Sequence, residues 1–234
     1  MTPPRIRHRI EYTRNKHSRA VCSGDIIIIR LARNLSKTEE QEHICSLLRR
    51  MTQLVLQERQ KKVINPFRHL LDGGQSLTIT LATGKQYMFT LVPGSRTVAI
   101  RQHRGWKVFI SPQLRKRALH QLLWRLIGEQ EKGRLQELVN EINRRTFRAT
   151  LKGTRLRFAT TQWGSCSPRG VIMLNTALLF LPPSLLRYVI VHELAHRLQA
   201  NHSSAYWREV KWALPTYERA YRALQGYRLP ARQL

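Results

Sequence analysis

Residues 182–199 form an almost uninterrupted apolar segment that also holds two histidines and a glutamate. It opens with Pro182-Pro183-Ser184, a typical helix start, and its apolar residues then fall on nearly every side of a helix: Leu185, Leu186, Tyr188, Val189, Ile190, Val191, Leu194, Ala195 and Leu198. A helix that is apolar all round is buried. Because burying two imidazoles and a carboxylate without partners is unfavourable, the segment predicts a core helix whose polar residues share a ligand.

The polar residues of this helix read His192-Glu193-Leu194-Ala195-His196, which is the H-E-x-x-H pattern. One helical turn separates the two histidines, so both imidazoles can face one metal ion. Glu193 lies about 100° round the helix from His192, where it can take a proton from a water at the metal without being a ligand. Two histidines can also simply hydrogen-bond in a core, but the burial favours zinc, with Glu193 as the general base of a hydrolase.

A catalytic zinc ion has three protein ligands and one open position, so a third ligand is needed. We predict His202, because it follows the second histidine at the spacing of the H-E-x-x-H-x-x-G-x-x-H pattern. Gln199 stands where that pattern has glycine, and we expect Asn201 to supply the left-handed turn instead. Glu209 and Glu218 are alternative third ligands from the following helices.

Short strands around one helix are predicted in the N-terminal half. The expected strands are residues 25–31, 77–81, 86–91, 97–100 and 106–110. The four isoleucines within the first of them suit a strand buried on both faces. Ser36 and Glu39 have capping-box spacing and predict a helix that ends near Asn65-Pro66.

Helices are expected to dominate after residue 110. Ser111-Pro112 predicts the start of one, which Gly128 and Gly133 should bend or divide. Two strands, residues 154–162 and 170–175, are expected before the helices that begin at Pro182, Ser203 and Pro215. We therefore predict an α+β protein, with a β-rich subdomain containing one helix over residues 1–110 and a metal-binding catalytic domain over residues 111–234.

The chain has 41 Lys and Arg against 14 Asp and Glu, a net charge of +27 that favours polyanionic partners. These charges are spread along the whole sequence without a recognition motif, so a solvated basic surface explains them equally well. Three scattered cysteines, Cys22, Cys45 and Cys166, indicate a reducing compartment. No apolar run reaches the roughly 18 residues of a membrane span, and residues 1–19 lack a secretory signal, so we expect a cytoplasmic protein.

Several motifs together resemble the YgjP-like family of zincin metallopeptidases, which is related to the SprT and WLM groups. The resemblance covers residues 162–212, about a fifth of the chain. Its motifs are Trp163-Gly164-Ser165-Cys166-Ser167, the strand with Ile172, Leu174 and Asn175, Val191 to His196, and Asn201-His202-Ser203 with Trp207. The resemblance implies that the catalytic domain is zincin-like, helical with a small sheet, and it supports His202 as third ligand.

The first of these motifs, Trp163, Gly164, Ser165 and Cys166, is a candidate substrate-binding segment. Beside the metal, the main chain of an edge strand could align an extended peptide by strand addition. A turn with a buried tryptophan is the structural alternative. A nucleophilic Cys166 is disfavoured, since the activated water already supplies the nucleophile.

Three functions are compatible with these sequence features. The favoured one is a zinc metallopeptidase that acts on a peptide or protein. The second is a metal-dependent nucleoside triphosphate pyrophosphohydrolase, in which Lys152, Arg155, Arg157 and Arg169 could hold phosphates, although no G-x-x-x-x-G-K-[ST] loop is present. The third is a basic nucleic-acid-binding module with structural zinc. Two points count against it: structural zinc sites normally have four protein ligands, and Glu193 would have no task.

Overall fold

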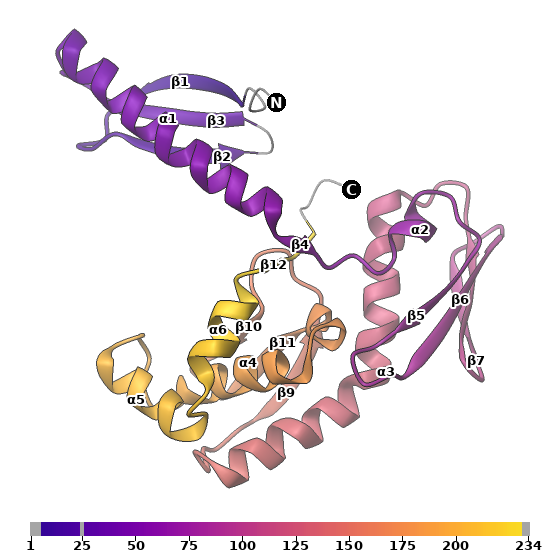
Figure 1. Cartoon of the computed structure of the whole chain (residues 1–234). Helices are drawn as coiled ribbons and strands as arrows, with labels where there is room; N and C mark the ends of the chain where they lie inside the picture. Colours follow the sequence, from indigo (N-terminus) through magenta and orange to yellow (C-terminus); the bar gives the residue numbers. More distant parts are fainter. Residues whose placement is uncertain (1–5, 24–25, 231–234) are drawn as a thin grey trace. The chain divides into compact units, whose positions relative to one another are not determined.

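The computed structural model describes residues 6–23 and 26–230, and the chain divides into two compact units, Met1–Lys62 and Val63–Arg232 (Figure 1). Each unit has its own hydrophobic cluster. The architecture is α+β, as the sequence predicted, with helices and several small mixed sheets. In the described part of the chain, no helix is both long and apolar enough to cross a membrane.

The first unit is a three-stranded sheet with one helix on its face. Its elements are β1 (Arg7–Thr13), β2 (Arg19–Ser23), β3 (Ile26–Ala32) and α1 (Lys37–Gln60). The strand order is β1-β3-β2, with β3 parallel to β1 and antiparallel to β2. Ser36 and Glu39 form the predicted capping box at the start of α1.

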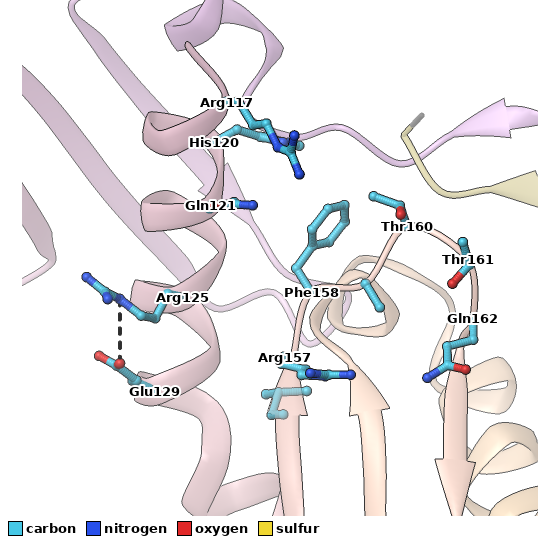
Figure 2. Close-up of a pocket in the computed structure, with 12 residues that line it drawn as sticks. Arg117, His120, Gln121, Arg125, Glu129, Arg157, Phe158, Thr160, Thr161 and Gln162 are labelled. Carbon is cyan, nitrogen blue, oxygen red and sulfur yellow. Dashed lines mark ion pairs between the residues drawn. The ribbon is translucent and has the colours of Figure 1, made fainter. Parts of the chain in front are cut away.

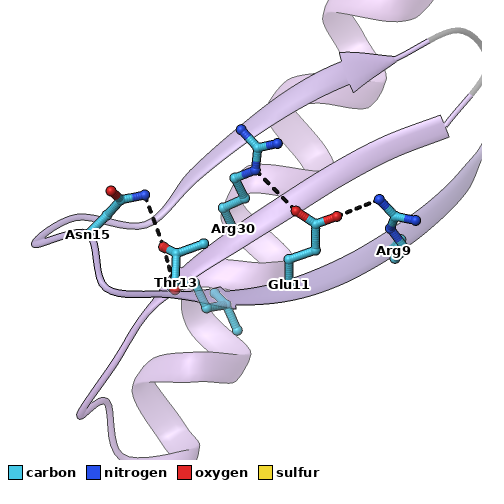
Figure 3. A network of polar contacts seen from close by, with 6 residues as sticks. Arg9, Glu11, Thr13, Asn15 and Arg30 are labelled. Carbon is cyan, nitrogen blue, oxygen red and sulfur yellow. Dashed lines mark hydrogen bonds and ion pairs between the residues drawn. The ribbon is translucent and has the colours of Figure 1, made fainter.

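The isoleucine run in β3 is buried on one face, whereas the sequence suggested burial on both. Ile27 and Ile29 are fully buried with Leu31 against α1, but Ile26 is 40% exposed. On the opposite face, Glu11 of β1 lies between Arg9 and Arg30 and bonds both (Figure 3). One face is apolar and the other polar because side chains alternate along a strand and a single helix covers only one side.

The second unit contains two sheets joined through a long helix. The four-stranded sheet has the order β5-β6-β8-β7, and the three-stranded sheet the order β10-β11-β9. The strands are β5 (Ser76–Thr80), β6 (Gln86–Pro93), β7 (Val98–Gln102), β8 (Gly105–Ile110), β9 (Gly153–Arg157), β10 (Gly164–Cys166) and β11 (Val171–Asn175). Two further short strands are β4 (Lys62–Val63), at the boundary of the two units, and β12 (Tyr227–Arg228).

The helices of the second unit follow the predicted order. They are α2 (Arg68–Leu71), α3 (Lys116–Arg145), the 3₁₀ helix η1 (Thr176–Phe180), α4 (Pro183–Ala195), α5 (Ser204–Ala213) and α6 (Tyr217–Leu224). The strands expected at residues 77–81, 86–91, 97–100 and 106–110 appear as two hairpins, the antiparallel pairs β5–β6 and β7–β8. Residues 164–166, for which the sequence left an edge strand and a turn open, form β10, which pairs with β11.

Helix α3 differs from its prediction in two ways. It begins at Lys116 rather than at Ser111-Pro112, because the Ser111 N–H is still bonded to Thr97 beside the end of β8. It then runs for 30 residues without a break through Gly128 and Gly133. Packing of its apolar side chains between the two sheets outweighs the weak helix propensity of two glycines.

The compact units divide at residues 62 and 63, whereas the sequence indicated a boundary between residues 110 and 111. The four-stranded sheet and α3 share one aromatic core. Phe67 packs edge-on against Phe89 of β6 at 5.4 Å and against Trp124 of α3 at 5.1 Å between ring centroids. Residues 76–110 therefore belong to the same compact unit as the apolar helix α4.

Candidate metal centre

Helix α4 is the apolar core helix that carries the H-E-x-x-H residues. Pro183 occupies its first turn, and its apolar side chains are buried on all sides, including Ile190 and Leu194 at 0% exposure. His192 and Glu193 lie in its last turn, and His196 is the C-cap residue. The end of a rigid, buried helix thus holds these three polar side chains.

The structure brings His192, His196 and His202 together. Each offers a ring nitrogen, and these nitrogens all lie within 4.8 Å of one another; Nε2 of His202 is 3.1 Å from Nε2 of His192. Nitrogen ligands about 2 Å from one zinc ion in tetrahedral geometry lie on the order of 3.3 Å apart. The donor set and its spacing therefore fit a divalent metal of the zinc type.

Hydrogen bonds orient two of the imidazoles. Nδ1 of His196 lies 3.1 Å from the carbonyl oxygen of Gln199, which can only accept a hydrogen bond, so Nδ1 is the donor. Nδ1 of His192 lies 3.4 Å from the hydroxyl of Tyr188, one turn earlier on α4. Because the carbonyl holds the proton of His196 on Nδ1, the Nε2 lone pair of His196 stays free for a metal. Burial, with smaller contributions from the neighbouring histidines, lowers the pKa of His192 to about 4, so its imidazole is neutral at pH 7.

Helix α5 presents His202 and closes one side of the cluster. Ser203 caps α5 by accepting the Tyr206 N–H at 3.3 Å, which fixes His202 directly before the helix. The Tyr206 ring lies 4.7–5.3 Å from all three imidazoles, and its hydroxyl donates to the His192 carbonyl at 3.0 Å. Trp207 stacks on His202. Sequence reasoning missed the roles of Tyr188, Tyr206 and Gln199, and only the four-residue spacing of Tyr188 from His192 hinted at one.

The prediction that Asn201 turns the chain in the left-handed conformation is wrong. Among the described non-glycine residues, positive φ angles occur at Asn34 and Arg148. The chain instead leaves α4 through a tight turn, in which the N–H groups of Leu198 and Gln199 both bond the Ala195 carbonyl at 3.0 Å. A turn of this kind satisfies the last carbonyls of the helix without a left-handed residue.

The two alternative third ligands lie in other surroundings. Glu218 pairs with Arg222 at 3.2 Å on the exposed side of α6. Glu209 lines a separate hollow with Phe147 and Trp212. Neither belongs to the group of side chains with metal-ligand spacing, which consists of the three histidines.

Glu193 is buried directly beside strand β10. Its side chain is only 5% exposed, and burial raises its pKa to about 8. A Cβ atom on Gly164 would lie 2.6 Å from Oε1 of Glu193, so only glycine permits this approach of β10 to α4. A divalent cation at the histidines would favour the charged carboxylate and oppose the effect of burial.

Strand β10 lies at the edge of its sheet and is bonded to β11 through alternate residues. The Trp163 carbonyl accepts the Asn175 N–H at 2.8 Å, and the Ser167 N–H donates to the Val171 carbonyl at 2.9 Å. In an antiparallel ladder every second residue faces the partner strand. The main-chain groups of Gly164 and Cys166 therefore point away from β11, toward the free edge.

The side chains of the candidate substrate segment have different surroundings. Trp163 and Cys166 are partly buried and pack against the main hydrophobic cluster. Burial raises the pKa of the Cys166 thiol, which opposes formation of a nucleophilic thiolate. Arg157, a candidate phosphate ligand, lines a cavity that none of the three histidines lines, and Lys152, Arg155 and Arg169 do not line that cavity.

An α+β unit with an H-E-x-x-H helix, a third histidine and an edge strand defines a metallopeptidase-type protein. The chain matches the family of the YgjP-like metallopeptidase domain over residues 20–227, and it belongs to that family. A crystal structure of the metallopeptidase zymogen of Pyrococcus abyssi abylysin is 26% identical, with a TM-score of 0.34, over 42% of this chain and 98% of that chain. No curated protein matches. Membership of the family implies a divalent metal and a peptide or protein substrate.

Proposed function

We propose that the chain is a zinc-dependent peptidase with His192, His196 and His202 as zinc ligands and Glu193 as general base. The observation that carries this proposal is the set of three imidazole nitrogens within 4.8 Å of one another beside a buried carboxylate. A buried glutamate without an ion-pair partner is costly to maintain, and general-base catalysis gives it a task.

Bound zinc would polarise the scissile carbonyl and increase the acidity of a water molecule. Glu193 accepts a proton from that water while the water oxygen attacks the carbonyl carbon. The C–N bond then breaks, and Glu193 returns the proton to the leaving amine nitrogen. Burial raises the pKa of Glu193 and a bound cation would lower it again, and this balance suits a carboxylate that first accepts and then returns a proton.

The free edge of β10 is the proposed peptide-binding element. The outward main-chain groups of Gly164 and Cys166 would pair with an extended peptide, as in strand addition. The absence of a side chain at Gly164 lets this strand lie against Glu193. The scissile carbonyl of a peptide held at this edge would thereby be placed near the general base.

The first experiment is elemental analysis of zinc in the wild type and in His202→Ala, both purified without added metal. We expect about one zinc per wild-type chain and little in the variant. Cleavage of an unfolded protein is then compared between the wild type and Glu193→Gln, for which a loss of at least ~100-fold with zinc retained is expected. Full zinc in His202→Ala, or equal cleavage by Glu193→Gln, would contradict the proposal.

The other two functions have less support. Arg157 lines a cavity that none of the three histidines lines, so this candidate phosphate ligand is not part of the histidine cluster. A structural zinc site normally has four protein ligands, whereas the group here has three. Release of pyrophosphate from a nucleoside triphosphate, absent in Glu193→Gln, would favour the phosphoanhydride function.

A further inference from the structure

A cavity of about 580 Å³ lies between α3 and the segment that follows β9 (Figure 2). On the helix side, Arg117, Gln121 and Arg125 are spaced four residues apart and so occupy one stripe of α3. On the other side, Arg157 at the end of β9 and Thr160 and Gln162 in the segment after it line the cavity. Polar side chains from two elements therefore border one hollow, with Arg117 and Arg157 at its two ends and Phe158 between them (Figure 2).

The wall of the cavity is rigid. Phe158 stacks on the fully buried Trp124 with 4.5 Å between ring centroids and an interplanar angle of 8°. The Trp124 indole N–H donates to Nε2 of His120 at 2.7 Å, which holds a further lining residue in place. A hollow with such a wall is formed before a ligand arrives, so ordering it costs little conformational entropy.

The charge of the cavity is positive. Three guanidinium groups line it against one carboxylate, Glu129, whose Oε1 is 3.8 Å from Nε of Arg125. Within the described part of the chain, Arg117 and Arg157 have no ion-pair partner. The glutamine and threonine side chains add neutral hydrogen-bond donors, and such a set of donors favours an anionic group.

The position of the cavity near β10 favours a peptide as the source of the anion. Gln162 lines it and is two residues from Gly164, a distance of at most about 7 Å along the chain. Gly164 in turn lies against Glu193. A peptide that extends along the free edge of β10 would pass the general base and reach the cavity within a few residues. A carboxylate on that peptide is thus favoured over the backbone of a nucleic acid.

We propose that this cavity is a specificity subsite for an acidic side chain of the peptide substrate, bound by Arg117 and Arg157 at a distance from the scissile bond. This inference rests on the proposed peptidase function, because it takes the substrate to lie along β10. The carboxylate would receive a charge-assisted hydrogen bond from one of these guanidinium groups and be attracted by the positive charge of the other, with Gln162 and Thr160 as neutral donors in the same cavity.

The test uses full-length protein in the Glu193→Gln background, so that binding is measured without cleavage. In one series of peptides, aspartate is placed at successive positions on either side of one cleavable bond. In a matched series, asparagine replaces the aspartate. Fluorescence anisotropy at about 0.15 M salt measures the affinity of both series. We expect aspartate at one position to tighten binding at least ~10-fold. The preference should vanish in Arg117→Gln/Arg157→Gln and persist in Arg96→Gln/Arg104→Gln, a control that removes two exposed arginines outside the cavity.

Five outcomes are informative. Loss of the preference only in the cavity variant supports the subsite. Equal loss in the control variant would show general charge attraction and overturn it. The inference also fails if the cavity variant loses affinity for a short oligonucleotide but not for the acidic peptide. Wild-type cleavage without any acidic preference would overturn the subsite alone. Preferential binding without wild-type cleavage would overturn the peptidase function, and with it the role of the cavity as a substrate subsite, leaving only a site for acidic peptides.

Discussion

At the scale of single residues, the close approach of Gly164 to Glu193 requires glycine at position 164. We predict that Gly164→Ala lowers peptide cleavage at least ~100-fold while zinc content stays at the wild-type level, because the new methyl group would lie 2.6 Å from Oε1 of Glu193 and displace the carboxylate. Steady-state kinetics and elemental analysis check this.

A matched control for that variant is Gly133→Ala. A Cβ at Gly133 meets nothing within 4 Å, so this change should leave both cleavage and zinc unaltered. If Gly164→Ala cleaves peptide as fast as Gly133→Ala, the carboxylate does not depend on the close approach of β10, and the assigned role of Gly164 is wrong.

His120 is predicted to link stability to pH. Burial lowers its folded-state pKa to about 4, below the value of about 6.5 of the unfolded chain. Between these values the unfolded state binds more protons, so the stabilisation is fully present above pH 6.5 and is lost as the pH falls toward 4. The loss is up to about 3 kcal/mol.

His120→Gln tests this link, since glutamine retains an acceptor for the Trp124 N–H and does not titrate. Urea unfolding at pH 7 and pH 4 should show a smaller acid-induced loss of stability in the variant than in the wild type. Equal losses in the two proteins would mean that His120 is not the group responsible, and that other groups account for acid sensitivity.

At the scale of secondary-structure elements, the two glycines of α3 differ in their surroundings. Gly133 is exposed with open space around its Cα, and Gly133→Ala should stabilise the protein by about 0.5–1 kcal/mol through higher helix propensity. At Gly128 a methyl group would lie 3.2 Å from Oγ1 of Thr176 and 3.3 Å from the Leu156 carbonyl, so Gly128→Ala should give no gain or a loss. Midpoints of urea unfolding measure both effects.

Destabilisation by Gly133→Ala would contradict a continuous helix through this position.

The prediction of helices and strands was accurate where the sequence signal was local and repeated. The capping box at Ser36 and the alternation of the hairpins both appear in the structure. It was wrong at the start and continuity of α3, and it left β10 open between an edge strand and a turn, because tertiary packing and pairing with β11 decided these features.

At the scale of the whole molecule, two hydrophobic clusters predict two folding units. Residues 62–234 should fold cooperatively on their own and bind one zinc, because their core, which includes Phe89 and Trp124, is complete within that fragment. Residues 111–234 should not, since without β5 to β8 the partners of Trp124 around Phe67 are lost. Urea unfolding, monitored by tryptophan fluorescence, and zinc analysis distinguish the two fragments.

A cooperative, zinc-binding fragment of residues 111–234 would instead support the domain boundary that the sequence indicated. Failure of residues 62–234 to fold would show that the larger unit depends on residues 1–61. Both fragments retain α4 and the three histidines, so any difference between them reports on the supporting core rather than on loss of a ligand.

The sequence by itself determined the features that depend on neighbours along one element. The four-residue spacing of His192 and His196 on an apolar helix predicts that both imidazoles face the same way, and the α+β class follows from the periodicities of the segments. Family membership was likewise readable from the motifs between residues 162 and 212.

Only the tertiary structure decided what depends on contacts between distant segments. It placed Tyr206 against the three imidazoles, set Gly164 against Glu193 and gathered Arg117 with Arg157 around one cavity. It also joined the four-stranded sheet to α3 in one core. Each of these contacts links residues far apart in the sequence, and periodicity within one segment carries no information about which distant segment packs against it.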